Sequence, residues 1–463
     1  MKKLSGILLI IAVMICSCKK DNFITSPDAN ISFSSDTLFY DTVFTSAGSI
    51  TQFVRLYNNN DQKLLVDAID LGGGINSPFK INVDGTPGGA SALEILPNDS
   101  LYIFVSVFVD PTAANTPFIL RDSLRVKYNG NERYVQLQAF GQNATFLKGH
   151  TVTGNETWNS NKPYVILDRL TVAENASLTL LPGCRLYFHA DAPMLIEGTL
   201  VSAGEHYDSM RISMQGDRLD APYNAFPGSW PGIYFGPKSH DNLLSYTDIK
   251  NAYQGLVAEE PSVNAAPKIV LKQCSISNCF DAGIVAVRSD ISAENLLVSN
   301  SGRNIVLSFG GRYDFKHLTN VGYSNSYLAH AKPVLSVSNI LEDANAVYAA
   351  DLEASFINCI FWGEDGLVTN EVEIIKEGNT PFTVNFSNSL WKMSTVPTTV
   401  SVDNMINNQD PLFRVIESNR RMYDFRLKEG STALGHGQFV NVAVDFDGKP
   451  RSNATPDAGA FEQ

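Results

Sequence analysis

One short phrase built around an asparagine returns along the middle of the chain, and it limits the possible folds more than any other feature. CSISNCFDAGIVAV (274–287) and LLVSNSGRNIVLSF (296–309) align without a gap at an offset of 22 residues. Units of about 20 to 30 residues are typical of stacked supersecondary repeats. Apolar and polar residues alternate within each copy, so each unit is predicted to consist of strands. The repeat asparagines are spaced by 27, 22, 20, 19, 19 and 30 residues: Asn251, Asn278, Asn300, Asn320, Asn339, Asn358 and Asn388.

These asparagines are interpreted as a structural ladder. Equivalent residues lie above one another in a stack of coils, and asparagine tolerates the left-handed conformation of a tight turn. Its amide can also pass a hydrogen bond to the next coil. The alternative interpretation is a row of ligand-binding amides, but the neighbouring Ile, Val and Leu residues predict that these turns lie beside the core.

Four cysteines follow the N-terminal region: Cys184, Cys274, Cys279 and Cys359. Cys279 and Cys359 each follow a repeat asparagine, so equivalent places on different coils are predicted for them. With about 4.8 Å per stacked strand, they would lie roughly 19 Å apart, too far for a disulfide. Free, buried thiols are therefore expected, and no CxxC or Cys/His spacing predicts a zinc site.

The N-terminus has the layout of an export signal. Lys2 and Lys3 precede an apolar run at 7–15 that is too short to span a bilayer comfortably, and Ile15-Cys16-Ser17-Cys18 ends it. This ending resembles a bacterial lipobox, which implies removal of residues 1–17 and lipidation of Cys18, followed by a tether (18–29). The expected location is the bacterial outer membrane, surface-exposed, with the lipid as the only membrane contact. A plain secretory signal or an uncleaved anchor is the alternative.

The charge of the chain excludes some partners. Without residues 1–17, Lys2 and Lys3 are lost, which leaves 33 basic against 48 acidic residues and a net charge of −15. Nucleic-acid binding needs clustered Lys and Arg, and no such cluster occurs in this sequence. Broad contact with an acidic polymer is also disfavoured, although a local basic patch stays open.

The remaining chain is predicted to form two domains and a closing segment. Residues 30–146 contain short strand patterns separated by Gly and Asn, among them TQFVRLYN and SLYIFVSVFV, and predict a β-sandwich. RLYNNN, LEILPNDSLYIFVSVFVDP and VQLQAFG resemble the immunoglobulin-like modules of the hydin type, which implies a spacer or an adhesion unit. Residues 147–400, from YVILDRLTVAENASLTLLPG onward, resemble the right-handed parallel β-helix family of bacterial surface lipoproteins. Residues 401–463 are similar to the C-terminal stretch of many secreted β-helix proteins and are predicted to cover the last coil.

The expected fold is therefore all-β, with an N-terminal immunoglobulin-like β-sandwich followed by a right-handed parallel β-helix. This fold hosts lyases, hydrolases and adhesins, so activity must come from particular residues. Polygalacturonase-like hydrolases share three motifs on consecutive coils: Asn-Thr-Asp, Asp-Asp and Gly-His-Gly. Here only Gly435-His436-Gly437 is present, after the repeats, and we interpret it as a turn.

A lyase would need a Lys or Arg base and often calcium. Calcium is expected only under that alternative, and no other cofactor or metal is predicted. Asp281 and Arg303 align on adjacent coils and are expected to meet as an ion pair. The other candidates lie in the insertion at 205–229 and in the repeat interruptions that contain Glu259 and Glu260 or span 358–388. The charged residues of the insertion are Asp208, Asp217, Arg218 and Asp220.

Aromatic residues give a second hypothesis. Trp230, Tyr234, Trp362 and Trp391 could stack on sugar rings if exposed, or fill the core if they point inward. The favoured function is non-catalytic binding or adhesion to an extracellular glycan or cell-surface component, and whether the protein is an enzyme stays open. The alternatives are a polysaccharide lyase or glycoside hydrolase, and a structural surface scaffold.

Overall fold

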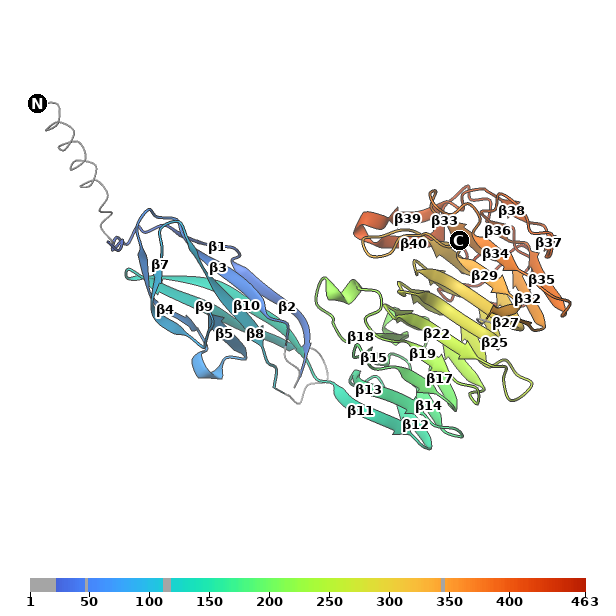
Figure 1. Ribbon diagram of the computed structural model, residues 1–463, viewed down its shortest axis with the longest axis horizontal. Helices are drawn as coiled ribbons and strands as arrows, with labels where there is room; N and C mark the ends of the chain where they lie inside the picture. Colours follow the sequence, from blue (N-terminus) through green and yellow to red (C-terminus); the bar gives the residue numbers. More distant parts are fainter. Residues whose placement is uncertain (1–21, 46–48, 111–117, 343–345) are drawn as a thin grey trace, which may run out of the picture. The chain divides into compact units, whose positions relative to one another are not determined.

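The computed structural model describes residues 22–45, 49–110, 118–342 and 346–463. It divides the chain into two compact units, Met1–Asn143 and Ala144–Gln463, both built from strands (Figure 1). Cys18 lies outside the described residues, so its lipidation stays a prediction. Among the residues described, no helix is long and apolar enough to cross a membrane.

The first unit is a sandwich of two five-stranded sheets. The pairs are antiparallel except β2 with β10, which is parallel. Alternate residues of each strand point between the sheets, such as Val54 and Leu56 or Leu64 and Val66, all fully buried. One sheet has the order β1 (Ile31–Phe33), β3 (Gln52–Asn58), β8 (Ser100–Val107), β5 (Phe79–Val83), β6 (Thr86–Pro87). The other has the order β2 (Thr37–Phe44), β10 (Asn131–Gln142), β9 (Phe118–Tyr128), β4 (Leu64–Leu71), β7 (Ala90–Ile95).

The second unit is a parallel β-helix in which the strands of successive coils pair in three columns, here called faces I, II and III. β11 (Thr145–Val152) and β13 (Tyr164–Val172) bend from face I to face II. β25 (Ala282–Glu294) and β27 (Arg303–Lys316) bend from face II to face III. The expected succession of a sandwich and a β-helix is thus confirmed.

The other strands each belong to one face. Face I contains β15 (Arg185–Phe188), β18 (Ile212–Gly216), β21 (Thr247–Lys250), β24 (Ser275–Ser277), β26 (Leu297–Ser299), β28 (Thr319–Gly322), β33 (Ile360–Gly363), β36 (Leu390–Trp391) and β38 (Ile406–Asn407). Face II contains β16 (Met194–Ile196), β19 (Ile233–Phe235), β22 (Gln254–Glu259), β29 (Leu335–Ser338) and β34 (Val372–Ile375). Face III contains β12 (Asn155–Trp158), β14 (Ser177–Leu180), β17 (Thr199–Ala203), β20 (Asn242–Ser245), β23 (Ile269–Lys272), β32 (Leu352–Ile357), β35 (Phe382–Ser387) and β37 (Ser401–Asp403).

Two hairpins and four short 3-10 helices complete the described structure. The hairpins are β30 (Ile340–Glu342) with β31 (Val347–Ala349), and β39 (Phe413–Glu417) with β40 (Met422–Leu427). The 3-10 helices are η1 (Gly74–Asn76), η2 (Asp208–Met210), η3 (Tyr223–Ala225) and η4 (Ser418–Arg420).

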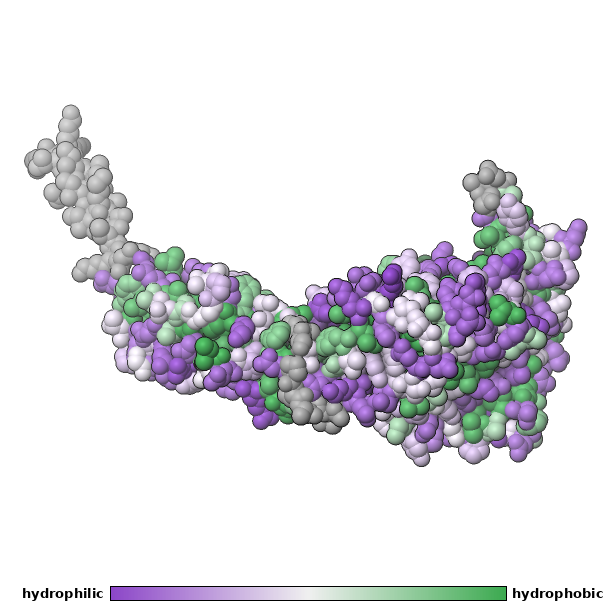
Figure 2. All heavy atoms as spheres, turned by 90° about the horizontal axis from the view of Figure 1, so that it is seen from below, coloured by the Kyte–Doolittle hydropathy of each residue, from purple (hydrophilic) through white to green (hydrophobic). Residues whose placement is uncertain are grey.

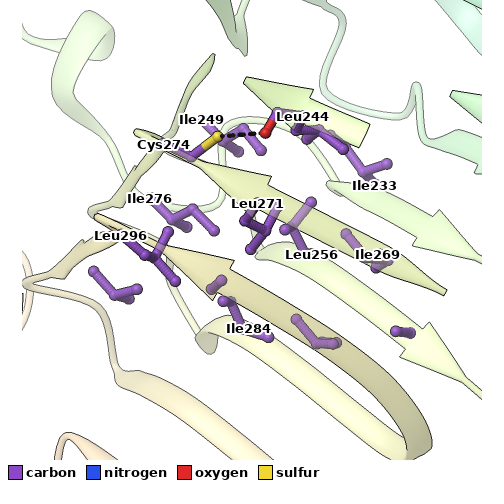
Figure 3. Packing of buried hydrophobic residues seen from close by; sticks show 14 of the residues in the cluster. Ile233, Leu244, Ile249, Leu256, Ile269, Leu271, Cys274, Ile276, Ile284 and Leu296 are labelled. Carbon is purple, nitrogen blue, oxygen red and sulfur yellow. Dashed lines mark hydrogen bonds between the residues drawn. The ribbon is translucent and has the colours of Figure 1, made fainter. Parts of the chain in front are cut away.

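The interior of the helix is filled by the alternate apolar residues of all three faces. Figure 3 shows Ile249, Ile276, Leu271 and Ile284 from neighbouring coils pointing into one core, and each is buried. Cys274 lies among them and donates its thiol to the Leu244 carbonyl at 3.3 Å. The four described cysteines are free and buried, as expected. Burial raises the pKa of Cys274 to about 12, so the thiol stays protonated and inert. Hydrophilic residues dominate much of the outer surface seen in Figure 2.

The repeat asparagines do not form one ladder, which corrects the prediction. Asn251, Asn278 and Asn300, with φ of 62°, 53° and 51°, form the turn from face I to face II, here called the first turn column. Asn358 and Asn388, with φ of 57° and 47°, belong to the turn from face III to face I, the second turn column. That column also contains left-handed Tyr246, Gln273, Asn295, His317 and Asn404.

The reason is a mismatch between the asparagine spacing and the length of a coil. Asn278 and Asn300 are 22 residues apart, and the paired residues Val298 and Asn320 are separated by the same step. The next asparagine step, of 20 residues, therefore moves Asn320 from the turn into strand β28. Asn339 follows β29 of face II. Likewise, Cys279 follows the first column and Cys359 the second, so their predicted equivalence is wrong.

The C-terminal segment is also placed differently from the prediction. Residues 401–407 still belong to the last coil through β37 and β38, and the chain after them packs against the outer side of face I instead of covering that coil. Val321, Ile360 and Leu390 point outward there and share a buried cluster with Phe413, Phe425, Leu427, Ala433, Ala458, Ala460 and Phe461. β37 of the last coil stays exposed, although the His436 ring touches that coil at the Asn404 carbonyl, 2.8 Å away. Apolar outward residues on face I explain this placement, since burying them stabilises the lateral position.

Candidate functional site

The outer side of face I bears a groove between β18 and β26. Two cavities of about 540 and 500 Å³ share Lys250, Ser275, Leu297, Tyr423 and Phe425 in their linings, so we treat them as halves of one groove. Its floor is the outward row of residues on consecutive coils. In the strand register, Asp248 lies beside Ser275, and Ser275 lies beside Leu297. In the second outward row, Lys250 lies beside Ser277, and Ser277 lies beside Ser299.

The two walls come from segments outside the coil repeat. The insertion supplies His206 and Asp208 to the larger cavity and Asn224 and Ala225 to the smaller one. The C-terminal segment supplies the opposite wall, formed by Arg420, Arg421, Tyr423, Asp424, Phe425, Arg426, Phe446, Asp447 and Phe461. We call the larger cavity the tail half and the smaller one the insertion half.

The first turn column holds the insertion in place. Asn251 donates its side-chain amide to the Asn224 carbonyl at 2.8 Å, and Asn278 donates to the Ala225 carbonyl at 2.9 Å. Asn278 also donates to the Oδ1 of Asn251 at 2.8 Å, the one coil-to-coil bond within the described structure that joins two of the seven repeat asparagines. Asn278 Oδ1 is itself buried without a hydrogen-bond partner in the described structure.

The second turn column holds the C-terminal segment. Asn295 donates to the Val444 carbonyl at 2.8 Å, and Asn388 donates to the His436 carbonyl at 3.2 Å. Asn358 makes a reciprocal pair with the backbone of Gln438, donating at 2.8 Å and accepting at 2.9 Å. The left-handed turn residues on both edges of face I thus fasten the two walls of the groove.

Aromatic contacts connect the walls at the insertion half. The rings of Phe226 and Tyr327 meet edge to face with centroids 4.9 Å apart. The guanidinium of Arg421 lies 5.0 Å from the centroid of the same Tyr327 ring. This bridge links the insertion, the loop between β28 and β29, and the tip of the β39–β40 hairpin.

Ion pairs occupy three of the four carboxylates of the tail half, all except Asp208. Arg211 contacts both oxygens of Asp248, at 2.8 and 2.6 Å, and lies 4.5 Å from the Phe446 ring centroid. Arg426 pairs with both oxygens of Asp447 at 2.7 Å and also contacts Asp424 at 2.9 Å. Such charge-assisted, bidentate pairs fix the carboxylates in place and leave them little freedom to act as acid or base.

Lys250 differs from these residues. Within the described residues its ammonium has no hydrogen bond or ion pair with a protein group. Desolvation by the surrounding protein lowers its pKa below the ordinary lysine value, and the nearby charge of Asp248 only partly opposes this. An unpaired, partly desolvated cation on the floor of a groove is a candidate binding or reactive group.

The structure answers the sugar-stacking hypothesis residue by residue. Trp230 and Trp391 are fully buried; Trp230 stacks on Phe188 with centroids 4.3 Å apart, and Trp391 packs on Phe386 at 5.0 Å. Their predicted contact with glycan is therefore wrong, because both rings point into the apolar interior. Trp362 is half-buried beside the C-terminal cluster, and half-buried Tyr234 donates to the Pro231 carbonyl at 3.3 Å. For these two residues glycan contact stays a prediction.

The other charged candidates form structural contacts. Arg303 meets Asp281 at 2.6 Å, which confirms the predicted ion pair. Asp217 contacts His189 at 2.8 Å, and Arg218 contacts Asp220 at 2.9 Å. Over the described parts of the chain, no group of three or more His, Cys, Asp or Glu residues is arranged to hold a metal ion.

Two features of the groove were missed by the sequence reasoning. Lys250 is the last residue of β21, and only the strand alternation Thr247, Asp248, Ile249 would have indicated that it faces outward beside Asp248. The wall formed by the C-terminal segment had one signal in the sequence. Ile360, Trp362 and Leu390 are apolar, and the strand alternation places them on the outer side of face I. Of the predicted suspects, the insertion at 205–229 does line the groove.

Comparisons with known proteins add little to this description. No family model matches the sequence, and no curated protein matches it. A solved family 123 glycoside hydrolase from Clostridium perfringens is 11% identical, with 26% of this chain and 30% of that one covered and a TM-score of 0.19. A GH87 α-1,3-glucanase catalytic unit from Streptomyces thermodiastaticus is 10% identical, with 77% and 89% covered and a TM-score of 0.20. TM-scores this low carry no argument about this chain.

Proposed function

We propose that this protein is a surface lipoprotein whose β-helix binds an extracellular glycan in the groove on face I. The observation that carries the proposal is the groove itself, an open channel floored by serines and lined by amides, charges and the rings of Tyr423 and Phe425. Sugar sites combine polar groups that hydrogen-bond to hydroxyls with aromatic surface that packs on the ring.

The geometry favours binding over hydrolysis. A hydrolase needs two carboxyl groups free to exchange protons on either side of the scissile bond. Of the four aspartates in this groove, Asp248, Asp424 and Asp447 are engaged by arginines, and only Asp208 has no ion pair within the described structure. Their negative charges therefore stabilise the wall and the floor of the groove.

Lys250 supports a second candidate, cleavage by β-elimination. Its lowered pKa brings the neutral amine, the form that can accept a proton, closer to physiological pH. A neutral Lys250 would take the proton beside the carboxylate of a uronic acid. The electron pair would form a carbon–carbon double bond, and the glycosidic oxygen would leave and take up a proton. The unsaturated product absorbs ultraviolet light and is readily measured.

The test combines a glycan array with a product assay on the full chain. We expect retention of at least one polysaccharide, without the ultraviolet absorbance of an unsaturated product and without new reducing ends. Ser277→Trp should abolish retention, because the indole fills the insertion half of the groove. Product release would replace the binding proposal with catalysis.

Ser292→Trp is the matched control. Ser292 occupies an outward, half-buried place on the face III part of β25, away from the groove lining. We expect it to leave retention unchanged. If no polysaccharide is retained, or if Ser277→Trp binds as well as the unmodified protein, the proposed function is wrong.

A further inference from the structure

The charges in the groove are divided between its halves. The tail half has four carboxylates, Asp208, Asp248, Asp424 and Asp447, against Arg211, Arg426 and the shared Lys250, so negative charge is in excess there. In the insertion half the charged lining residues are Lys250, Arg420 and Arg421, and no Asp or Glu belongs to that lining. A local cationic site is unexpected in a chain with a net charge of −13.

The cations of the insertion half are only weakly compensated. Arg420 reaches Glu417 at 3.2 Å, but both side chains are largely exposed, so this pair contributes little. Arg421 lies over the Tyr327 ring and Lys250 has no hydrogen-bonding or ion-pairing partner among the described residues. In the strand register, Lys250 lies beside Ser277 of the next coil, and Ser277 lies beside Ser299 of the coil after it, so its outward neighbours along this row are uncharged.

We infer that the glycan bound in this groove carries a negative charge, a carboxylate or a sulfate ester, which sits on the Lys250 ammonium with Arg420 and Arg421 nearby. The inference rests on the proposed binding function and adds the class of ligand. Ser275, Ser277 and Ser299 then meet the hydroxyls of the same sugar, and Tyr423 and Phe425 offer ring surface beside it.

Lys250 is exposed at the end of β21, so the protein desolvates its ammonium only in part, and a bound anion opposes that effect. Without a ligand, the surrounding protein disfavours the charged form of Lys250. A bound anion stabilises the ammonium and so raises its pKa, which means that the protein takes up a proton on binding at alkaline pH. β-Elimination would need the neutral amine of Lys250 instead, because Lys250 must lose its proton before it can act as the base.

The experiment measures the affinities of the full chain for polygalacturonate, a sulfated galactan and a neutral galactan. At least one anionic polymer should bind about tenfold more tightly than the neutral one, as expected for one charge-assisted contact. The preference between the two anionic polymers tells carboxylate from sulfate. Affinity for the anionic polymer should also fall as salt is added.

Lys250→Met should lower that affinity about tenfold, and Lys250→Arg should keep most of it. Lys272→Met is the matched control, since Lys272 also ends a four-residue strand but pairs with Glu294 on face III.

Calorimetry at about pH 9.5, in two buffers of different ionisation enthalpy, should detect proton uptake that Lys250→Met removes.

Two results separate the inference from the proposed function. The inference is wrong if the neutral and anionic polymers bind with equal affinity and Lys250→Met leaves that affinity unchanged. The proposed function still holds in that case if Ser277→Trp blocks binding. If none of these polymers nor any other polysaccharide is retained, or if Ser277→Trp has no effect, the function fails and the inference fails with it.

Discussion

The two halves of face I share one interior and differ on the outside. From β18 to β26 the outward residues are mostly polar, with Asp248, Lys250 and Ser277 among them, and they form the floor of the groove. From β28 to β36 the outward residues Val321 and Ile360 are apolar and are buried under the C-terminal segment. The outward residues of each coil on this face therefore separate the part that the segment covers from the part that lines the groove.

The attachment of the segment is not purely hydrophobic, because a buried arginine also holds it. Arg451 is 6% exposed and donates to Asn295 Oδ1 at 2.7 Å, to the Gly459 carbonyl at 2.9 Å and to Glu462 at 3.0 Å. It connects the segment to the second turn column at the boundary between the covered and the open half.

The largest effect is expected for Arg451→Met. Removing one member of a buried ionic network leaves its partners uncompensated, so we expect a loss of about 3–5 kcal/mol in the free energy of unfolding. Denaturant unfolding measures the loss, and limited proteolysis should cut the C-terminal segment first. Arg414→Met, at an exposed place on β39, is the control and should change stability by less than about 0.5 kcal/mol. Equal stability of the two variants would contradict the anchoring role.

A smaller effect is expected for Asn358→Leu. Leucine would leave the N–H and the carbonyl of Gln438 unpaired, and it tolerates a φ of 57° poorly. We expect a loss of about 2–4 kcal/mol, measured by denaturant unfolding. Asn300→Leu in the first column serves as the comparison, because Asn300 Oδ1 accepts one backbone hydrogen bond, from Tyr323 at 3.0 Å. Its loss should be about 1–3 kcal/mol, and the reverse order would refute the stronger role of the second column.

The smallest effect depends on pH. Burial and the nearby Arg451 lower the pKa of His317 from 6.5 to about 2. The unfolded chain therefore binds one proton more than the folded chain between these values, so stability falls as pH drops below about 6.5. His317→Asn, which matches the four asparagines of the column, should remove about 1.4 kcal/mol of the stability lost between pH 7.5 and pH 5.5. Identical pH profiles of both proteins would show that His317 does not carry this sensitivity.

Much of the fold could be predicted because it depends on local patterns. The alternation in CSISNCFDAGIVAV gives strands, and the 22-residue offset gives the length of one coil, both of which the register of Val298 with Asn320 bears out. The position of each asparagine could not be predicted in the same way. A step of 20 residues resembles a step of 22 in the sequence, but it moves Asn320 from a turn into a strand.

The candidate site was much less predictable. In the sequence, Trp230 was a candidate for contact with sugar, because the side chain of an aromatic residue after an insertion can point outward or into the core. Its ring points inward, where it stacks on Phe188. The groove itself needs residues from β21, from the insertion and from Tyr423, which are far apart along the chain.

The sequence by itself therefore determined the strands, the length of a coil and the succession of a sandwich and a parallel β-helix, because these follow from the alternation and spacing of neighbouring residues. Tertiary structure alone decided which face of each strand is covered, where the C-terminal segment lies, and that Lys250 is left unpaired among the described residues on the floor of a groove. These features depend on packing between segments up to about 200 residues apart, which local patterns do not encode.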